Sequence, residues 1–388
     1  MVSATVERPA VARALESVED SRDATAAFLA EIGAILSPSG EEQERAEAVA
    51  RRMRSIGLDS VRVTESPNAI GVIPGRSGQA LVFVSTLDDL ATVAEHQRAA
   101  EGPPRVVGNR VVGPGTNTSL TTAAVLSAAE AYLEAGLQPE HDLVFAGVAQ
   151  EETGLRGMRA LYEDYADRAV AFVDVLGDGE SISYGALGIH WWRVVARGPA
   201  GHTLRGGLPN VNLGIGRAVD RILSTPWARR DDDTRARVNV AMLQSGAVFN
   251  HKPDSGWFSL DLRSMEGPVL DSMETDVGRI LEEVSAETGI ELAMEPFSLI
   301  PGGRIAGALE SELVTTAAAI SRHLGHEPSL SEYGSANLNV AIAAGTPAIG
   351  LGGGRGGDRG GPGEWADVDV MMRTAHHVLL LATILGGS

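Results

Sequence analysis

The sequence contains no cysteine, and only 4% of its 388 residues are aromatic. Without cysteine, the chain has no disulfide, no thiol nucleophile and no thiolate metal ligand. Basic residues are also sparse, because 32 Lys and Arg stand against 51 Asp and Glu, which gives a formal net charge of −19. That charge argues against a nucleic-acid backbone or an anionic membrane as a partner.

Long hydrophobic runs are also lacking. The longest apolar run, VLLLATIL at 378–385, is far shorter than the ~20 residues that span a bilayer. The N-terminal stretch MVSATVERPAVARALESVED has no cationic start followed by an apolar segment, so no signal peptide is predicted. We therefore expect a cytoplasmic protein without a membrane partner. A hydrophobic content of 44% is enough for a full core, and the length favours two domains.

The order of predicted elements indicates an α/β domain that is interrupted by an insert. Helices and strands alternate up to about residue 185 and again after about residue 303. Between them the pattern runs β-α-β-β-α-β, which is typical of a compact ferredoxin-like antiparallel sheet backed by two helices. We expect an α/β domain, a mixed sheet with helices on both faces, formed by 1–185 and 303–388, and an inserted α+β domain formed by 186–302.

Acidic side chains follow three predicted core strands of the α/β domain. They are Asp88 with Asp89, Glu151 with Glu152, and Asp174. Any one of these acids alone is explained by a solvated strand end or a helix cap. Three such places in one domain favour a site, because functional groups of open α/β sheets gather at the carboxyl ends of the strands.

Several motifs, in this order and spacing, resemble the M20 family of zinc peptidases and aminoacylases, which includes dipeptidases, acetylornithine deacetylase and succinyl-diaminopimelate desuccinylase. The resemblance extends from about residue 22 to 385 and implies the fold described above. It also implies a homodimer, since the inserted domain of the family commonly mediates dimerisation. The motifs are GPGTNTSL (113–120), QEETGLRGMRAL (150–161), GPAGHT (198–203), NHKPDSGWFSLDLRS (250–264) and AAGTPAIGLGGG (343–354).

The family resemblance implies two zinc ions that activate a water molecule and polarise an amide carbonyl. Of the five usual ligands, Glu152 and Asp174 match two carboxylates. Thr86 stands at the position of the first His, Asn117 or Thr118 at the bridging Asp, and Gly360 at the last His. Threonine hydroxyl and neutral amide oxygen are weak donors for zinc. We therefore expect no cofactor, with zinc or another divalent metal as the alternative.

The same resemblance assigns roles to other residues. Glu151 matches the general base, Asp88 matches the Asp of the first motif, and His202 matches a His that reaches the partner subunit's active site and steadies the oxyanion. These three are the expected catalytic residues. If a metal binds, the expected ligands are Glu152, Asp174 and Asp88. The expected substrate-binding residues are Asn210, Asn250, Arg263, Thr86, Asn117, Asn337 and Arg359.

Electrostatics suggest how such a site works without metal. Several carboxylates in one cleft repel one another, so at least one should have a raised pKa and hold a proton at neutral pH. Arg355 and Arg359 flank the position of the lost His, and a guanidinium there could occupy the place of the metal. Solvated loop arginines are the alternative for each of them.

Three functions remain open from the sequence. The first is an M20-like enzyme that acts on an amide or related carbonyl group of a small molecule without the zinc pair, with Glu151 as general acid–base and His202 on the oxyanion. The second is a metal-dependent amidohydrolase with a reduced or mononuclear site. The third is a non-catalytic binding protein. The acidic composition favours a small substrate that bears an amine.

Overall fold

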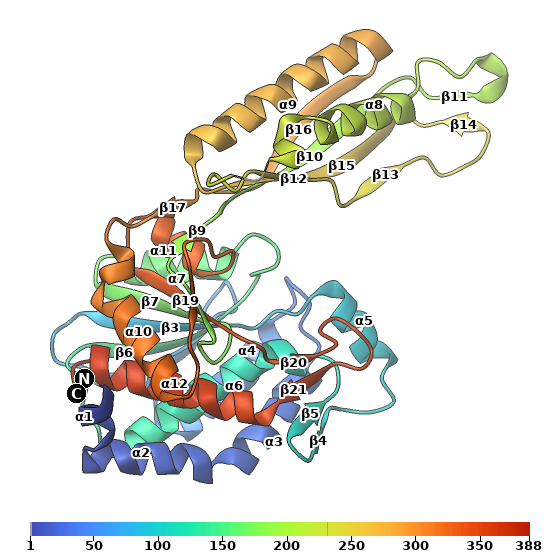
Figure 1. The fold of residues 1–388 in the computed structure, drawn as a ribbon. Helices are drawn as coiled ribbons and strands as arrows, with labels where there is room; N and C mark the ends of the chain where they lie inside the picture. The colour runs from blue at the N-terminus through green and yellow to red at the C-terminus, as the bar shows by residue number, and fades with distance from the viewer. Residues whose placement is uncertain (1, 231) are drawn as a thin grey trace. The chain divides into compact units, whose positions relative to one another are not determined.

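The computed structural model describes residues 2–230 and 232–388, and the chain divides into two compact units. Met1–Gly185 and Arg304–Ser388 form the first unit, and Ala186–Gly303 forms the second (Figure 1). Where the chain passes between the units, the short strands β9 (Gly185–Ala186) and β17 (Gly303–Arg304) pair with each other.

In the first unit, eight strands of the described residues form one mixed sheet in the order β1-β2-β6-β3-β7-β19-β8-β18. The centre of the sheet is parallel, because β3 pairs in parallel with both β6 and β7, and β7 does so with β19. The strands are β1 (Asp59–Val63), β2 (Ala69–Ile73), β3 (Ala80–Thr86), β6 (Asp142–Val148), β7 (Ala169–Val175), β8 (Ser181–Ser183), β18 (Ser329–Ser331) and β19 (Ala348–Gly352).

The central strands are buried on both faces, which explains their nearly continuous apolar sequences. Every residue of β3 is buried, and Phe83 stacks on Phe145 of β6 with ring centroids 5.5 Å apart, on the face that α6 and α12 cover. On the other face, Phe172 of β7 meets Tyr162 of α7 at 5.6 Å. The expected mixed sheet with helices on both faces is confirmed.

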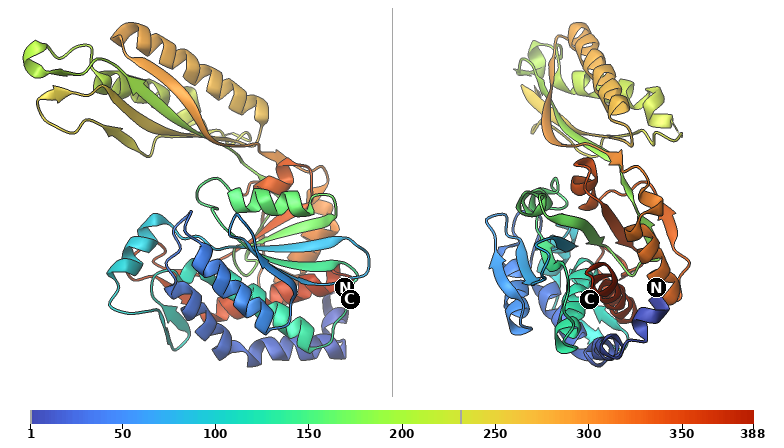
Figure 2. Two further views of the ribbon diagram at one scale, coloured as in Figure 1. Left: turned by 180° about the vertical axis from the view of Figure 1, so that it is seen from behind. Right: turned by 90° about the vertical axis from the view of Figure 1, so that its left-hand side faces the viewer.

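Helices α2 and α3, dark blue in Figure 2, pack against α6, while α7 and α11 pack against each other and the opposite face. By length and composition α12 is apolar enough to cross a membrane, but 67% of it is buried inside the unit, as in a core helix. The helices are α1 (Val2–Val6), α2 (Pro9–Asp20), α3 (Arg22–Ala34), α4 (Gln43–Ser55), α5 (Ala91–Ala99), α6 (Thr116–Glu134), α7 (Arg156–Tyr165), α10 (Glu312–His323), α11 (Leu338–Ala343) and α12 (Val368–Leu385).

A separate small sheet of the first unit holds the glycine-rich segments. Its order is β20-β21-β5-β4, so the hairpin formed by β4 and β5 pairs with a segment more than 250 residues later. The strands are β4 (Arg105–Val107), β5 (Arg110–Val112), β20 (Gly356–Gly357) and β21 (Trp365–Asp367). This pairing keeps the start of α6 and the loop before β21 in a fixed relation.

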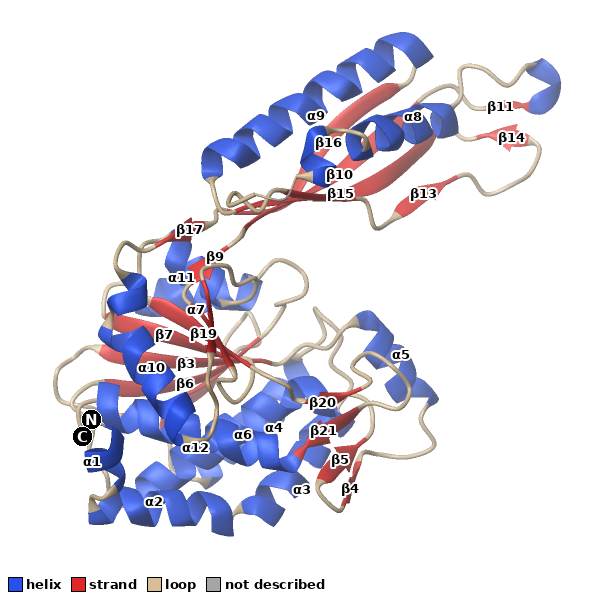
Figure 3. Cartoon of the chain, viewed as in Figure 1, coloured by secondary structure: helices blue, strands red, loops and turns tan. Residues whose placement is uncertain are grey.

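The second unit is an antiparallel sheet with two helices on one face, as expected (Figure 3). Alternate residues of β15, such as Phe258 and Leu260, are buried against the helices. The segment 237–246, one strand in the predicted β-α-β-β-α-β order, forms two short strands, and both pair with β15. The elements are β10 (Gly188–Arg197), β11 (Gly201–His202), α8 (Val211–Leu223), β12 (Arg237–Asn239), β13 (Leu243–Ser245), β14 (His251–Lys252), β15 (Ser255–Ser264), α9 (Gly267–Thr288) and β16 (Glu291–Ile300).

Candidate active site

The strand-end acids of the first unit lie at one edge of the sheet because three adjacent strands are parallel. The register pairs Thr86 of β3 with Val148 of β6, and Val84 of β3 with Asp174 of β7. Asp88 follows β3 directly, and Glu151 follows β6. Parallel strands end on the same side of a sheet, so the loops that carry these acids meet there.

Asp88 fixes the segment that carries the Glu pair. Its two carboxylate oxygens accept the backbone N–H groups of Glu151 and Glu152, at 2.9 and 3.0 Å. The side chain is buried, and burial raises the pKa of Asp88 to about 6, although the two backbone donors oppose that shift. Asp88 therefore acts here as an acceptor that positions its neighbours.

Asp89, expected to be a loop acid, is also buried and has a different partner. Its carboxylate lies 2.6 Å from Arg45, and both side chains are almost fully shielded from solvent. Arg45 also donates to the carbonyl of Leu87 at 2.8 Å. The pair ties α4 to the end of β3, so the two adjacent acids have separate structural tasks.

The amide of Asn337 connects two positions that the family uses for metal ligands. Its Nδ2 donates to Thr86 Oγ1 at 3.1 Å and to Asp174 Oδ1 at 3.3 Å. The other oxygen of Asp174 accepts the backbone N–H of Leu338, the first residue of α11, at 3.1 Å. All of these side chains are buried, and burial raises the pKa of Asp174 to about 6. Both carboxylate oxygens of Asp174 are thus taken up by protein donors.

The carboxyl group of Glu151 has no such partner. Among the described residues, it makes no hydrogen bond or ion pair, while its backbone N–H is held by Asp88. Burial first, and then the nearby charges of Glu152, Asp88 and Asp174, raise the pKa of Glu151 to about 8. A carboxyl group that holds its proton at neutral pH and has no fixed partner is suited to proton transfer.

Glu152, the neighbour of Glu151, faces a cation. Arg359 Nη2 lies 3.3 Å from Glu152 Oε1, and both side chains are partly exposed. Burial raises the pKa of Glu152, and the charges of Arg359 and Arg355 oppose that shift. The expected ligand Glu152 and the expected substrate contact Arg359 therefore form an ion pair.

Glu364 braces the two glycine-rich segments, a role that sequence reasoning missed. Its Oε1 accepts the N–H groups of Gly115 and Asn117, at 2.9 and 3.0 Å, and its Oε2 accepts that of Gly360 at 3.0 Å. The carboxylate is 1% exposed. Asn117, a predicted site residue, thus lies in the first turn of α6 beside this brace.

Gly360 occupies the position where the family has its last His. Its φ of +78° lies in the left-handed region, where residues with a side chain are strained. A Cβ there would point toward Thr92 and Leu90, at 3.4 and 3.6 Å. The loop backbone at this position therefore suits glycine, and a His would have to adopt a strained conformation.

Arg355 is the second cation at this edge. Its guanidinium is affected by the charges of Glu151, Glu364 and Asp174. Burial first, and then the charge of Arg359, lower the pKa of Arg355 to about 10, so the group remains charged at neutral pH. Unlike Arg359, it makes no ion pair or hydrogen bond through its side chain within residues 2–230 and 232–388.

The second unit brings two predicted residues together. The side-chain amide of Asn250 lies 3.1 Å from His202 Nε2, and the N–H of Leu204 donates to His202 Nδ1 at 3.2 Å. The ring of His251 meets that of His202 edge-on at 4.9 Å. His202 is thus held between Asn250 and the turn that follows it.

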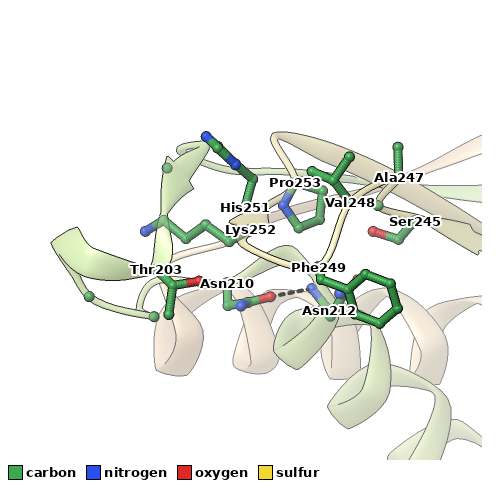
Figure 4. Close-up of a pocket in the computed structure, with 14 residues that line it drawn as sticks. Thr203, Asn210, Asn212, Ser245, Ala247, Val248, Phe249, His251, Lys252 and Pro253 are labelled. Carbon is green, nitrogen blue, oxygen red and sulfur yellow. Dashed lines mark hydrogen bonds between the residues drawn. The ribbon is translucent and has the colours of Figure 1, made fainter.

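An open cavity of about 530 Å³ lies beside these residues in the second unit (Figure 4). Asn210 lines it and caps α8 by accepting the N–H of Asn212 at 2.9 Å. Arg263 does not line this cavity. It lies eight residues along β15 from Ser255, about 26 Å at the usual rise of a strand, and it pairs with Asp261 at 3.0 Å.

The mixed sheet of the first unit, the inserted second unit and the acids at the carboxyl edge of the sheet agree with the M20 resemblance of the sequence. The model of Peptidase family M20/M25/M40 matches residues 92–383. The chain belongs to this family.

Individual relatives agree with this assignment. The chain is 25% identical over 328 residues to succinyl-diaminopimelate desuccinylase of Corynebacterium glutamicum, covering 82% of this chain and 85% of that protein. A tripeptidase from Staphylococcus aureus is 18% identical with a TM-score of 0.76, over 94% of this chain and 98% of that one. Human carnosine dipeptidase 1 is 13% identical with a TM-score of 0.72, over 96% and 99%. A dinuclear metal-binding M20 peptidase from Bacillus subtilis is 13% identical with a TM-score of 0.67, over 95% and 99%. The likeness to these structures shows the shared fold.

Proposed function

We propose that this protein hydrolyses an amide bond of a small N-acylated molecule without the zinc pair of its family, with Glu151 as the general base and acid. One observation carries the proposal. The Asn337 amide donates to Thr86 and Asp174, two positions where metal ligands are expected, while Glu151 has no partner among the described residues. The site therefore has its ligand positions satisfied and its acid–base group free.

The residues at the site do not fit two zinc ions. A metal needs lone pairs directed at it, but the Asn337 Nδ2 group directs N–H donors toward Thr86 and Asp174. The remaining acidic candidates are also engaged, since Asp88 accepts two backbone N–H groups. Among the residues that the structure describes, no group of three or more His, Asp or Glu side chains is arranged to hold a metal.

In the proposed reaction the ionised Glu151 takes a proton from water as the water oxygen attacks the amide carbon. The π electrons of the carbonyl move to its oxygen, and a tetrahedral intermediate forms. Glu151 then gives the proton to the nitrogen as the C–N bond breaks, which releases an amine and a carboxylic acid. Asp88 positions Glu151 for both steps by holding its backbone N–H. No other reactant is needed.

We infer a role for the second unit from the contacts of its own residues. Because Nδ1 of His202 accepts the N–H of Leu204, its Nε2 carries the ring proton, and in this proposal the Nε2–H exchanges its contact with Asn250 for the developing oxyanion. In this proposal His202 of one subunit serves the site of the other, so the active species is a homodimer. Asn210 and Asn250 would contact the remainder of the substrate.

The proposed substrate class follows from the relative and from the site. The name of the Corynebacterium relative describes a succinyl group on diaminopimelate, an N-acyl amino acid with a free amine. The acids at the carboxyl edge favour a substrate with an amine. We therefore propose N-acylated amino acids with a second amino group as the class to test first.

The test uses chelator-treated protein with its metal content measured by elemental analysis. We expect the protein to hydrolyse N-succinyl-L,L-diaminopimelate, or another N-acyl diamino acid, when it carries only trace zinc, about 0.1 ion per chain or less. Glu151→Gln should remove turnover, and Glu16→Gln, on the exposed surface of α2, should not. Activity that is lost on chelation and restored by zinc would contradict the metal-free proposal and favour the reduced metal site. If the wild-type protein binds these substrates but neither it nor any variant hydrolyses them, a non-catalytic role is favoured.

A further inference from the structure

The loop between β19 and β21 carries an arginine whose side chain is not explained by folding. The backbone of this loop is fixed, since the carbonyl of Arg355 accepts the N–H of Asp367 at 2.9 Å and β20 pairs with β21. Gly356 has φ +151°, and a Cβ there would lie 2.0 Å from the carbonyl oxygen of Trp365. The close packing of the loop therefore fixes the backbone position from which the Arg355 side chain extends.

The other arginines near this edge have direct partners. Arg359 pairs with Glu152 at 3.3 Å, Arg45 with Asp89 at 2.6 Å, and Arg373 with Asp178 at 3.0 Å. Arg355 differs, because its guanidinium has neither an ion pair nor a hydrogen bond within the described parts of the chain. Its N–H donors are thus available, and the residue is half-buried.

The carboxylates whose charges affect Arg355 belong to the proposed active site. The charges that affect it come from Glu151, which is the proposed acid–base group, and from Asp174 and Glu364. None of these carboxylates pairs with it directly, and those of Asp174 and Glu364 are already used by N–H donors. Arg359 of the same loop pairs with Glu152, the neighbour of Glu151, at 3.3 Å, so the loop that carries Arg355 lies against the segment of the proposed general base. A cation without a protein partner on this loop can stabilise the negative charge that develops on an acyl oxygen.

We propose that Arg355 is a catalytic residue whose guanidinium binds the acyl oxygen of the substrate amide and stabilises the oxyanion. The assignment rests on the proposed amide hydrolysis, and it adds a charged donor within the first unit to the His202 that the proposal takes from the other subunit. As water attacks, the carbonyl π electrons move to the oxygen, and Arg355 donates N–H hydrogen bonds to it without giving up a proton. After the C–N bond breaks, the same guanidinium holds the product carboxylate.

The first test is kinetic and uses N-succinyl-L,L-diaminopimelate with chelator-treated protein. Loss of one donor to an oxyanion typically lowers kcat by about 10²–10³-fold. We expect a fall of that order in Arg355→Met with KM changed less than about threefold, and a smaller fall in Arg355→Lys, which keeps the charge but not the planar fork. Arg322→Met is the matched control, because Arg322 lies on the surface of α10 and pairs only with the exposed Glu327. It should keep the wild-type kcat.

The second test does not require turnover. Isothermal titration with succinate, the product carboxylate of that reaction, should show binding to the wild type and Arg322→Met, and at least tenfold weaker binding to Arg355→Met. Circular dichroism checks that each variant is folded. Equal succinate affinity in the wild type and Arg355→Met, including no measurable binding by either, would overturn the assignment. So would a raised KM at unchanged kcat, since that describes a ground-state anchor.

The two proposals can fail separately. Arg355-dependent succinate binding in a protein that hydrolyses none of the N-acyl substrates would support the assignment of Arg355 as an oxygen-binding group and count against the hydrolysis. Metal-free hydrolysis that is unchanged in Arg355→Met would support the proposed function and overturn the role of Arg355.

Discussion

Asn337 Nδ2 donates a hydrogen bond of 3.1 Å to Thr86 Oγ1, across 251 residues of sequence. The same amide reaches Asp174, so one side chain satisfies two buried polar groups. This contact joins the end of β3 to the segment before α11 at the edge of the sheet where the acids meet. It is also the contact that most directly opposes a metal at this place.

Replacing Asn337 tests how much this contact stabilises the fold. In Asn337→Ala, Thr86 and Asp174 lose a donor while they remain buried, which should lower the free energy of unfolding by about 2–4 kcal/mol. Thr86→Val removes one hydrogen bond at constant shape and should cost about 1 kcal/mol. Urea denaturation monitored by circular dichroism measures both. Equal stability of Asn337→Ala and the wild type would show that the amide makes no net contribution.

The pKa of Glu151 sets the expected pH dependence of activity. Because burial and neighbouring carboxylates raise it to about 8, only the minor ionised fraction can act as a base at pH 7. The value of kcat/KM should therefore rise about tenfold per pH unit below pH 8 and level off above it. A profile measured from pH 5.5 to 9.5 checks this. A plateau that begins near pH 5 would mean that Glu151 ionises normally or is not the base.

The raised pKa of Glu151 also affects stability, but in the opposite direction, because stability falls where activity rises with pH. Above the ordinary pKa of 4.5 the unfolded chain loses the Glu151 proton, while the folded protein keeps it until about pH 8, so stability falls as pH rises through this window. His377, with a pKa lowered to about 4 by burial, gives a gain in stability with pH from 4 to 6.5. The raised pKa values of Asp88 and Asp174 also lower stability as pH rises, mainly below about pH 6.

Between pH 6.5 and 8 Glu151 is the main contributor among those groups, because Asp88, Asp174 and the unfolded His377 have by then lost half or more of their protons. Stability should fall there by at most about 1.4 kcal/mol per pH unit, and Glu151→Gln should remove that slope. Urea midpoints measured at pH 6.5, 7.2 and 8 provide the comparison. A wild-type slope that Glu151→Gln leaves intact would assign the effect to another group.

The buried pair of Arg45 and Asp89 gives a prediction that does not involve the reaction. Arg45→Met leaves a carboxylate buried without its cation, which should cost about 3–5 kcal/mol of unfolding free energy. The double variant Arg45→Met with Asp89→Leu should recover a large part of that loss. Removing the exposed pair of Arg322 and Glu327 should leave stability nearly unchanged, because solvent screens it. If the single and double variants at Arg45 are equally unstable, packing rather than charge accounts for the loss.

Much of the first unit could be predicted from sequence because its strands are short, apolar and followed by acids. Asp88, Glu151 and Asp174 stand at ends of strands whose parallel pairing brings them together. Helices α1, α2 and α5 were not predicted, and His96, expected in a loop, lies on α5. Those helices depend on packing against distant segments, as α2 does against α6.

The sequence was less informative about which groups pair with one another. Ser39 and Glu42 were consistent with a capping box, but Glu42 accepts the N–H groups of Gly40 and Gln150 instead. The brace formed by Glu364 joins residues about 250 positions apart, so local spacing gives no sign of it. Likewise, a glycine-rich loop with two arginines does not reveal which of them is paired, because that depends on the position of Glu152.

The left-handed backbone at Gly360 bears on how this chain could change by mutation. A single substitution to His would place a strained residue whose Cβ points toward Leu90 and Thr92. Recovering a zinc ligand there would also require the loop held by Glu364 to change its path, and Asn337 to leave Thr86 and Asp174. No single step gives a metal site, so the intermediates would lose stability before they gained an ion. The present loop is therefore difficult to change by one substitution, and variants of Gly360 alone should lose stability without gaining a ligand site.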